Sequence, residues 1–200
     1  MGTGSSPMGG GGMNIDPREA DSFFGSEWDN SLSTAEKVAV FDYAGDAYKA
    51  INPALWNSGG NLSRISDSLT TSSGENVKKE INDIDSALAK GILKQNIVVY
   101  RGDRGDIFQN ADAASINRMK GRTFQNMGYS SASITQDSAV QQRYMYRIVV
   151  PKGRGRGAFI RNQSPHYTEH EYLIKRNAKY KIKGATEQGK QIIVDLEMLP

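Results

Sequence analysis

The sequence contains no cysteine, so its fold has no disulfide, no thiolate metal site and no catalytic thiol. No apolar run approaches the length of a membrane-spanning helix, and we expect no membrane association. The first residues lack the basic and apolar regions of a signal peptide. The formal net charge is only +3 over 200 residues. Such a weak field is not typical of proteins that bind polyanions, so nucleic acid is not an expected partner.

The chain divides into a short tail and one domain. Residues 1–12 contain only Gly, Ser, Thr, Pro and Met, which is typical of an expression tag or flexible linker. Residues 13–200 are long enough for one ordinary to large domain. Hydrophobic residues make up 38% of the chain, which is enough for a sizeable core. We therefore expect a single domain over residues 13–200.

The N-terminal half has the pattern of helices. Ser33 and Glu36 have the spacing of a capping box, which predicts a helix start. Asn52-Pro53 is predicted to end that helix. A second helix is predicted over residues 75–90, with Gly91 as its stop. Apolar residues recur at spacings of three and four in the first helix and predict its buried face: Val38, Phe41, Ala44 and Tyr48.

The C-terminal half is rich in predicted strands, at residues 95–103, 123–133, 144–151, 158–161, 172–174, 179–184 and 191–198. Strands do not alternate with long helices here. This pattern argues against a doubly wound parallel sheet and predicts a segregated α+β fold.

Two carboxylates stand two residues apart where a polar turn meets an apolar strand. Ser164 and Pro165 mark the turn, and Glu169 and Glu171 follow it. Side chains alternate faces along a strand, so we expect both glutamates to project to one side and meet one substrate. His166 and His170 flank them, but no third ligand is evident, so a metal site is not expected.

An arginine and a pair of serines complete the candidate site. Arg101 ends an apolar strand, and its planar guanidinium suits a bidentate grip on phosphate. Ser131 and Ser133 lie two residues apart and can share one face of a strand. A serine hydroxyl there can form a hydrogen bond with a nearby glutamate or with a sugar hydroxyl. The basic residues between Lys152 and Arg161 alternate with glycine and lack aromatic stacking partners, which is typical of a solvated hairpin.

Five stretches stand in a specific order: Tyr43–Asn52, Val99–Gly102, Gly128–Ser133, Pro151–Ile160 and Asn177–Ile182. The first has the form Tyr-x-Gly-x-x-Tyr-x-x-Ile-Asn. With these stretches the chain resembles the bacterial mono-ADP-ribosyltransferase exotoxins, the class with an Arg, a Ser-Thr-Ser-like segment and a Glu-x-Glu or Gln-x-Glu pair. The resemblance covers Leu32 to Met198. It implies an α+β fold with a helical N-terminal half on a two-sheet β core.

The sequence departs from the family pattern at two positions. Ala132 replaces the middle threonine of the Ser-Thr-Ser segment. Gly102 stands where the actin-modifying binary toxins carry a second arginine. The resulting Arg-Gly pair resembles that of the Rho-modifying exoenzymes. Those exoenzymes carry Gln-x-Glu, whereas Glu169 here gives the pattern of arginine-modifying enzymes.

The resemblance implies that NAD is a co-substrate, without a metal. Glu171 would bind the ribose, Ser131 would orient Glu171, and Glu169 would engage the incoming arginine. The implied site residues are, for catalysis, Glu171, Glu169 and Ser131; for NAD binding, Arg101, Gly102, Ser131, Ser133, Tyr48 and Glu171; and for recognition of the target, Tyr167 and Glu169.

The expected function is transfer of ADP-ribose from NAD to an arginine of a target protein, with actin or a small GTPase as possible targets. Two alternatives stay open: an NAD glycohydrolase that uses the same residues, and a binding module without turnover. We expect a monomer that is secreted or injected and acts in the target-cell cytoplasm, or that acts in the cytoplasm of the producing or phage-infected cell.

Overall fold

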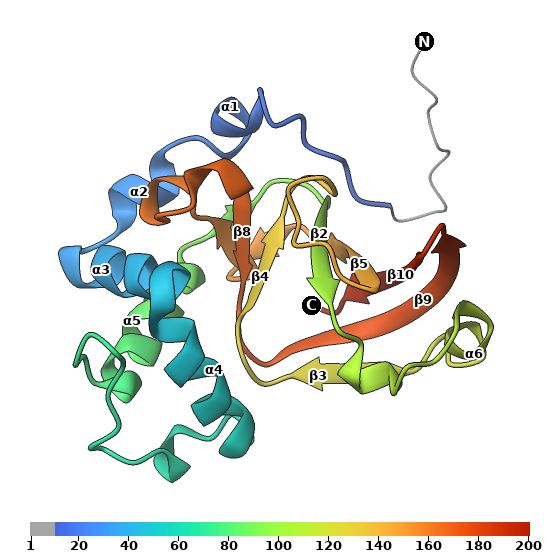
Figure 1. The fold of residues 1–200 in the computed structure, drawn as a ribbon. Coiled ribbons are helices and arrows are strands. Elements are labelled where there is room, and N and C mark those ends of the chain that lie inside the picture. Colours follow the sequence, from blue (N-terminus) through green and yellow to red (C-terminus); the bar gives the residue numbers. More distant parts are fainter. Residues whose placement is uncertain (1–10) are drawn as a thin grey trace.

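The computed structural model describes residues 11–200, apart from the side chain of Tyr167 (Figure 1). The prediction of a tag or linker over residues 1–12 therefore lies, for its first ten residues, outside the described part. Helices from the N-terminal half lie to one side of a sheet built from the C-terminal half. The helices are α1 (Ala20–Phe24), α2 (Glu27–Ser31), α3 (Thr34–Asp42), α4 (Tyr48–Asn57), α5 (Val77–Ala89) and α6 (Ala113–Asn117).

The predicted capping box at the start of α3 is confirmed. Ser33 Oγ accepts a hydrogen bond from the Glu36 backbone N–H at 3.2 Å, and the Glu36 carboxylate accepts one from the Ser33 N–H at 2.7 Å. The same carboxylate accepts hydrogen bonds from Lys90 Nζ and Ser86 Oγ, both at 2.6 Å. These bonds lower the pKa of the buried Glu36 to about 2, and they attach α3 to α5.

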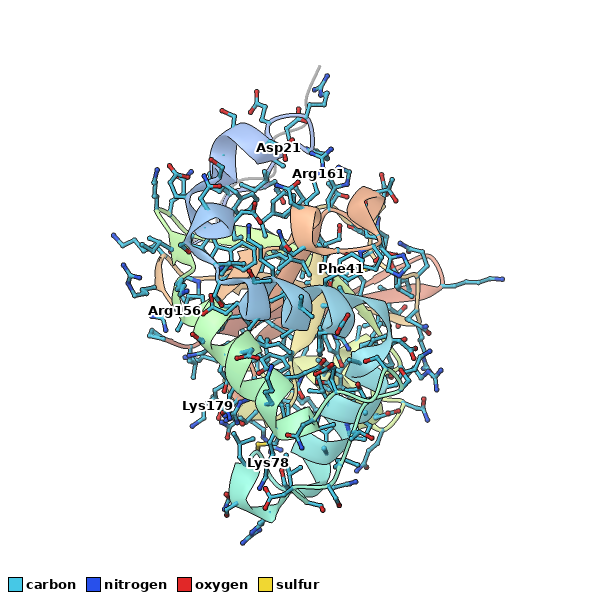
Figure 2. The ribbon with its side chains drawn as sticks, turned by 90° about the vertical axis from the view of Figure 1, so that its left-hand side faces the viewer. Asp21, Phe41, Lys78, Arg156, Arg161 and Lys179 are labelled. Carbon is cyan, nitrogen blue, oxygen red and sulfur yellow. The ribbon has the colours of Figure 1, made fainter. Side chains whose placement is uncertain are left out.

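The predicted apolar face of this helix is wrong at three of its four positions; Ala44 is half-buried and packs against the core. Val38, Phe41 and Tyr48 are 50%, 47% and 41% exposed, and Figure 2 shows Phe41 on α3. The reason is that apolar residues occupy two faces of α3, and spacing alone does not tell which face is buried. A π-helical turn over Tyr43–Ala47 then separates Tyr48 from the residues of α3. The residues that are buried stand at spacings of one, three and four: Ala39, Val40, Tyr43, Ala47, Ile51 and Leu55.

The predicted helix end at Asn52-Pro53 is also wrong, because α4 continues through Pro53 to Asn57. A proline inside a helix costs about 3 kcal/mol. Ile51 and Leu55 on either side of it are fully buried, and each such burial contributes about 1.5–3 kcal/mol. Tertiary packing of α4 therefore offsets the local cost of Pro53.

Within residues 11–200, eight strands pair in the order β3-β9-β10-β5-β2-β4-β8-β7. A single residue pair, Tyr100 with Ser133, joins β2 to β4. The sheet thus divides into a five-stranded and a three-stranded part, and the predicted α+β fold with a two-sheet core is confirmed. The strands are β2 (Ile97–Asp103), β3 (Thr123–Asn126), β4 (Ser130–Ser133), β5 (Tyr144–Val150), β7 (Gly157–Phe159), β8 (Glu171–Ile174), β9 (Ala178–Gln188) and β10 (Gln191–Met198), with β1 (Ile92–Leu93) and β6 (Gly153–Arg154) paired separately.

Helices α3, α4 and α5 pack on the three-stranded part. Tyr129, Ala158 and Leu173 from this part share one buried cluster with the apolar side chains of the helices. A second cluster fills the space around the five-stranded part and includes α6 residues. The junction between β2 and β4 lies where the two parts diverge, and it is there that the candidate site residues gather.

Candidate active site

The structure brings Arg101, Ser131 and Glu171 together at the junction of the two sheet parts. Arg101 ends the apolar part of β2, and its Nη1 donates a hydrogen bond to the Ser131 carbonyl at 2.8 Å. Ser131 lies on β4 next to β8, and its hydroxyl donates to Glu171 Oε1. The guanidinium, the hydroxyl and the carboxylate are therefore linked through one serine.

Glu171 is a buried carboxylate, with only 5% of its surface exposed. Burial raises its pKa to about 7, because the charged form loses hydration. The nearby Glu169 also raises this pKa, whereas Ser164 and Arg101 lower it. Ser164 Oγ donates a hydrogen bond to Glu171 Oε2 at 3.3 Å. Both carboxylate oxygens of Glu171 are thus held by serine hydroxyls.

Glu169 reaches the site by a different route from the one predicted. It lies in a 3₁₀ turn over Tyr167–Glu169, and His170 has a left-handed backbone with φ 48°. Strand alternation therefore does not place the two glutamates on one face, because only Glu171 belongs to β8. Even so, both line one hollow of about 90 Å³. Ser133 Oγ holds the turn by donating to the Glu169 carbonyl at 2.8 Å.

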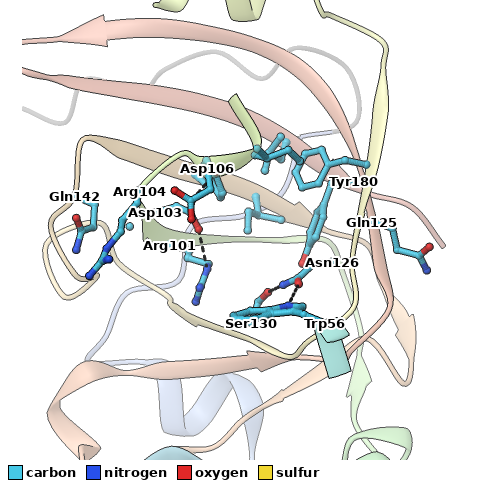
Figure 3. Close-up of a pocket in the computed structure, with 16 residues that line it drawn as sticks. Trp56, Arg101, Asp103, Arg104, Asp106, Gln125, Asn126, Ser130, Gln142 and Tyr180 are labelled. Carbon is cyan, nitrogen blue, oxygen red and sulfur yellow. Dashed lines mark hydrogen bonds and ion pairs between the residues drawn. The ribbon is translucent and has the colours of Figure 1, made fainter. Parts of the chain in front are cut away.

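Beside that hollow lies a larger cleft of about 470 Å³, and Figure 3 shows Arg101 among the residues that line it. Arg101 and Gly102 line both spaces. The larger cleft carries aromatic side chains together with polar and charged ones, among them Trp56, Asp103, Arg104, Phe124, Asn126, Ser130, Tyr146 and Tyr180. The guanidinium is therefore positioned to contact a ligand that extends from one space into the other.

Gly102 is required by close packing. A Cβ at this position would collide with the carbonyl oxygen of Val140. A second arginine after Arg101 therefore has no room in this conformation, which accounts for the departure from the binary-toxin pattern.

Three predicted residues have other placements. Ser133 lines the smaller hollow, but its hydroxyl is engaged with the Glu169 carbonyl and the Thr135 N–H. Tyr48 is exposed, packs edge-on against Tyr43 at 6.3 Å between ring centroids, and lines neither the hollow nor the cleft. The side chain of Tyr167 lies outside the described residues. Roles for these residues stay predictions.

Two observations on residues 11–200 concern metals and membranes. Among these residues, no group of three or more His, Cys, Asp or Glu side chains is arranged to hold a metal ion. Over the same range, no helix combines the length and the apolar character needed to cross a membrane.

Three residues around the site have contacts that the sequence pattern did not indicate. Ser164 was predicted only to mark a turn, yet it bonds Glu171. Asn52 is buried and fixes the segment before β4, because its side chain bonds both the N–H and the carbonyl of Tyr129. Trp56 lines the larger cleft. The Ile-Asn end of the helix motif was the one available signal for Asn52; Trp56 had none.

Comparison with known proteins gives consistent relatives. A sequence model of the ADP-ribosyltransferase exoenzyme family matches residues 24–200. The NAD(+)--arginine ADP-ribosyltransferase EFV of Enterococcus faecalis is 29% identical over 165 residues, which are 78% of this chain and 30% of that protein. The mono-ADP-ribosyltransferase C3 of Hathewaya limosa is 26% identical over 181 residues, 82% of this chain and 69% of that protein.

The fold comparison agrees. The structure of C3stau2 from S. aureus, determined with NAD, has a TM-score of 0.80 at 18% identity, covering 94% of this chain and 98% of that chain. This likeness shows the fold. Because the family match extends over most of the sequence, the chain belongs to the ADP-ribosyltransferase exoenzyme family.

Proposed function

We propose that the protein is an NAD-dependent mono-ADP-ribosyltransferase that transfers ADP-ribose to an arginine side chain of a target protein and releases nicotinamide. The observation that carries the proposal is the buried Glu171, which is held by Ser131 beside Arg101, together with the exposed Glu169 that lines the same hollow. Family membership and the stated activity of the Enterococcus relative support it.

The residues present fit NAD as the co-substrate. NAD supplies the ADP-ribosyl group, with nicotinamide as the leaving group. Arg101 offers a permanently charged planar fork between two hollows, which suits a diphosphate flanked by two nucleosides. We assign the nicotinamide riboside end to the smaller hollow, because Glu171 lines it.

Glu171 performs the electrostatic part of the reaction. Cleavage of the bond between nicotinamide and ribose develops positive charge on the sugar, as in glycoside hydrolysis. An ionised Glu171 accepts a hydrogen bond from the ribose 2′-hydroxyl and stabilises that charge. Ser131 and Ser164 keep its two oxygens in place, so little reorganisation is needed when the charge appears.

Glu169 acts on the acceptor. An arginine side chain has a pKa above about 12 and is a poor nucleophile while it is protonated. Glu169 is exposed at the mouth of the hollow, where it can bind the incoming guanidinium and accept its proton as the new bond forms.

The test is transfer of labelled ADP-ribose to polyarginine and to proteins of a cell lysate. We expect E171A to abolish both transfer and nicotinamide release. E169Q is expected to lose transfer and to retain NAD hydrolysis, which separates the two glutamates. Label that persists on E171A contradicts the assignment. Nicotinamide release by the wild type without labelling of any acceptor favours the glycohydrolase, and no release at all favours a binding module.

The wider assignments are part of the same proposal. Residues 13–200 form one catalytic domain, and its target carries a modifiable arginine, with actin or a small GTPase as the classes to test first. The activity is proposed to take place in the cytoplasm of a target cell. Mass spectrometry of a host lysate incubated with NAD and the enzyme identifies the modified protein, and modification of lysine or asparagine in place of arginine would contradict the acceptor assignment.

A further inference from the structure

Trp56 is an exposed aromatic residue at the edge of the larger cleft (Figure 3). It is 52% exposed, although a tryptophan usually buries most of its surface. Its orientation is nevertheless fixed, because the indole N–H donates to Asn126 Oδ1 at 3.0 Å. Asn126 is held in turn, since its amide donates to Ser130 Oγ at 2.8 Å. An exposed ring with a fixed orientation beside a cleft is suited to stack on a planar group.

The turn that holds the indole is shaped for it. A Cβ at Gly128 would lie 3.0 Å from Trp56 Nε1 and 2.7 Å from Asn52 Oδ1. Residue 128 must therefore lack a side chain for the turn to approach the indole so closely. The hydrogen-bonding edge of the ring faces this turn, and the exposed part of the ring remains for a ligand.

We propose that Trp56 is the stacking platform for the adenine base of NAD, an inference that rests on the proposed function. The nicotinamide end belongs at Glu171, which lines the smaller hollow. Trp56 lines the larger cleft, and among the described residues only Arg101 and Gly102 line both. With Arg101 on the diphosphate, the second base of the dinucleotide, adenine, falls on the side of Trp56.

Fluorescence provides the direct test, because the chain contains two tryptophans. The other one, Trp28, donates from its indole to the Ala87 carbonyl at 2.8 Å. In a W28F background the tryptophan emission comes from Trp56 alone. We expect AMP and ADP-ribose to quench it and nicotinamide mononucleotide, which lacks adenine, to leave it unchanged. Quenching by nicotinamide mononucleotide but not by AMP would overturn the proposal.

Kinetics give a second test. We expect W56A to raise the KM for NAD about tenfold or more with kcat little changed, since stacking of a base on an aromatic side chain is worth roughly 5- to 150-fold. W56F keeps a ring without the N–H and is expected to stay within about threefold of the wild type. F41A removes an equally exposed aromatic residue that does not line the cleft, and its KM should match the wild type.

The outcomes separate the two proposals. An unchanged KM for NAD in W56A overturns the stacking role. An equal rise of this KM in W56A and W56F assigns the effect to the hydrogen bond with Asn126, and this result also overturns the stacking role. If the wild type shows no turnover, the proposed function fails, but AMP affinity still decides the role of Trp56. In that case roughly tenfold weaker AMP binding by W56A supports the platform, and equal binding by both proteins overturns it.

Discussion

At the residue scale, the ionisation of Glu171 sets the pH dependence of the proposed reaction. Its pKa of about 7 means that the ionised form, which stabilises the positive ribose, accumulates as the pH rises through neutrality. We therefore expect kcat/KM for NAD hydrolysis to rise with pH and to level off above about 8, since kcat/KM reports the free enzyme. A midpoint near the ordinary value for glutamate would contradict control of the rate by a Glu171 with a raised pKa.

The neighbours of Glu171 should move this midpoint in opposite directions. Ser164 donates a hydrogen bond that lowers the pKa of Glu171, so S164A should shift the midpoint upward. The charge of Glu169 raises that pKa, so E169Q should shift it downward. Hydrolysis of NAD is the readout for both variants, because E169Q is expected to lose transfer. Shifts of the same sign in both variants would contradict this electrostatic account.

The raised pKa of Glu171 also has a consequence for stability. Its folded-state pKa lies above the unfolded value, so the contribution of Glu171 to stability is fully present at pH values below the unfolded pKa and is lost as the pH rises through about 7. E171Q removes the charge. We expect E171Q to be more stable than the wild type at pH 8, on the order of 2–3 kcal/mol, and most of this difference should disappear as the pH falls from 7 to 5. Urea unfolding at both pH values measures this, and a pH-independent difference would contradict it.

The motif pattern predicted Arg101, Ser131 and Glu171 as site residues, because each stands beside a recognisable apolar or hydroxyl-rich strand, and the structure brings the three together. Ser164 and Trp56 could not be identified in this way. Their contacts depend on which segments fold against them; the partner of Trp56, Asn126, is seventy residues away in the chain. The position of Glu169 could not be predicted from the sequence either, because the left-handed His170 interrupts the strand alternation that the sequence suggested.

At the element scale, Asn52 connects α4 to the segment that leads into β4. Its side chain makes two hydrogen bonds with the Tyr129 backbone, at 3.1 and 3.3 Å, and donates to the Tyr43 hydroxyl at 3.0 Å. N52A leaves buried polar groups without partners, and we expect it to lower the free energy of unfolding by about 2–4 kcal/mol. Urea unfolding measures the loss. The control is N57A, at the exposed end of the same helix, which should change the free energy of unfolding by less than about 0.5 kcal/mol. Equal stability of the two variants would contradict the role of Asn52.

Local sequence patterns predicted where helices and strands lie better than they predicted which of their faces are buried. Capping residues marked the start of α3, and β-branched runs marked β2, β5 and β10, since these preferences act over a few residues. The exposed positions of Val38 and Phe41 were missed because α3 carries apolar residues on two faces, and spacing alone does not tell which face is buried. The pairing of β2 with β4 through one residue pair is set by long-range packing, which periodicity does not report.

At the scale of the whole molecule, the segment that precedes α2 is part of the fold. Met13 forms backbone hydrogen bonds at the start of β2, with its carbonyl accepting from the Val98 N–H at 2.9 Å. Phe24 stacks on Phe159 with ring centroids 4.5 Å apart. These contacts attach the N-terminal segment to both parts of the sheet, although the family match begins only at residue 24.

Truncation tests where the domain begins. Removal of residues 1–12 keeps Met13 and its pairing, so we expect the Tm to change by less than about 2 °C. Removal of residues 1–24 also deletes the buried Ile15 and Ala20, the ring of Phe24, and the ion pair of Asp21 with Arg161 at 2.7 Å (Figure 2). Loss of about 3 kcal/mol from burial alone should lower the Tm by at least about 6 °C. Thermal unfolding of both truncated proteins measures this. Equal Tm values would place the domain boundary near residue 24, in conflict with the proposed domain over residues 13–200.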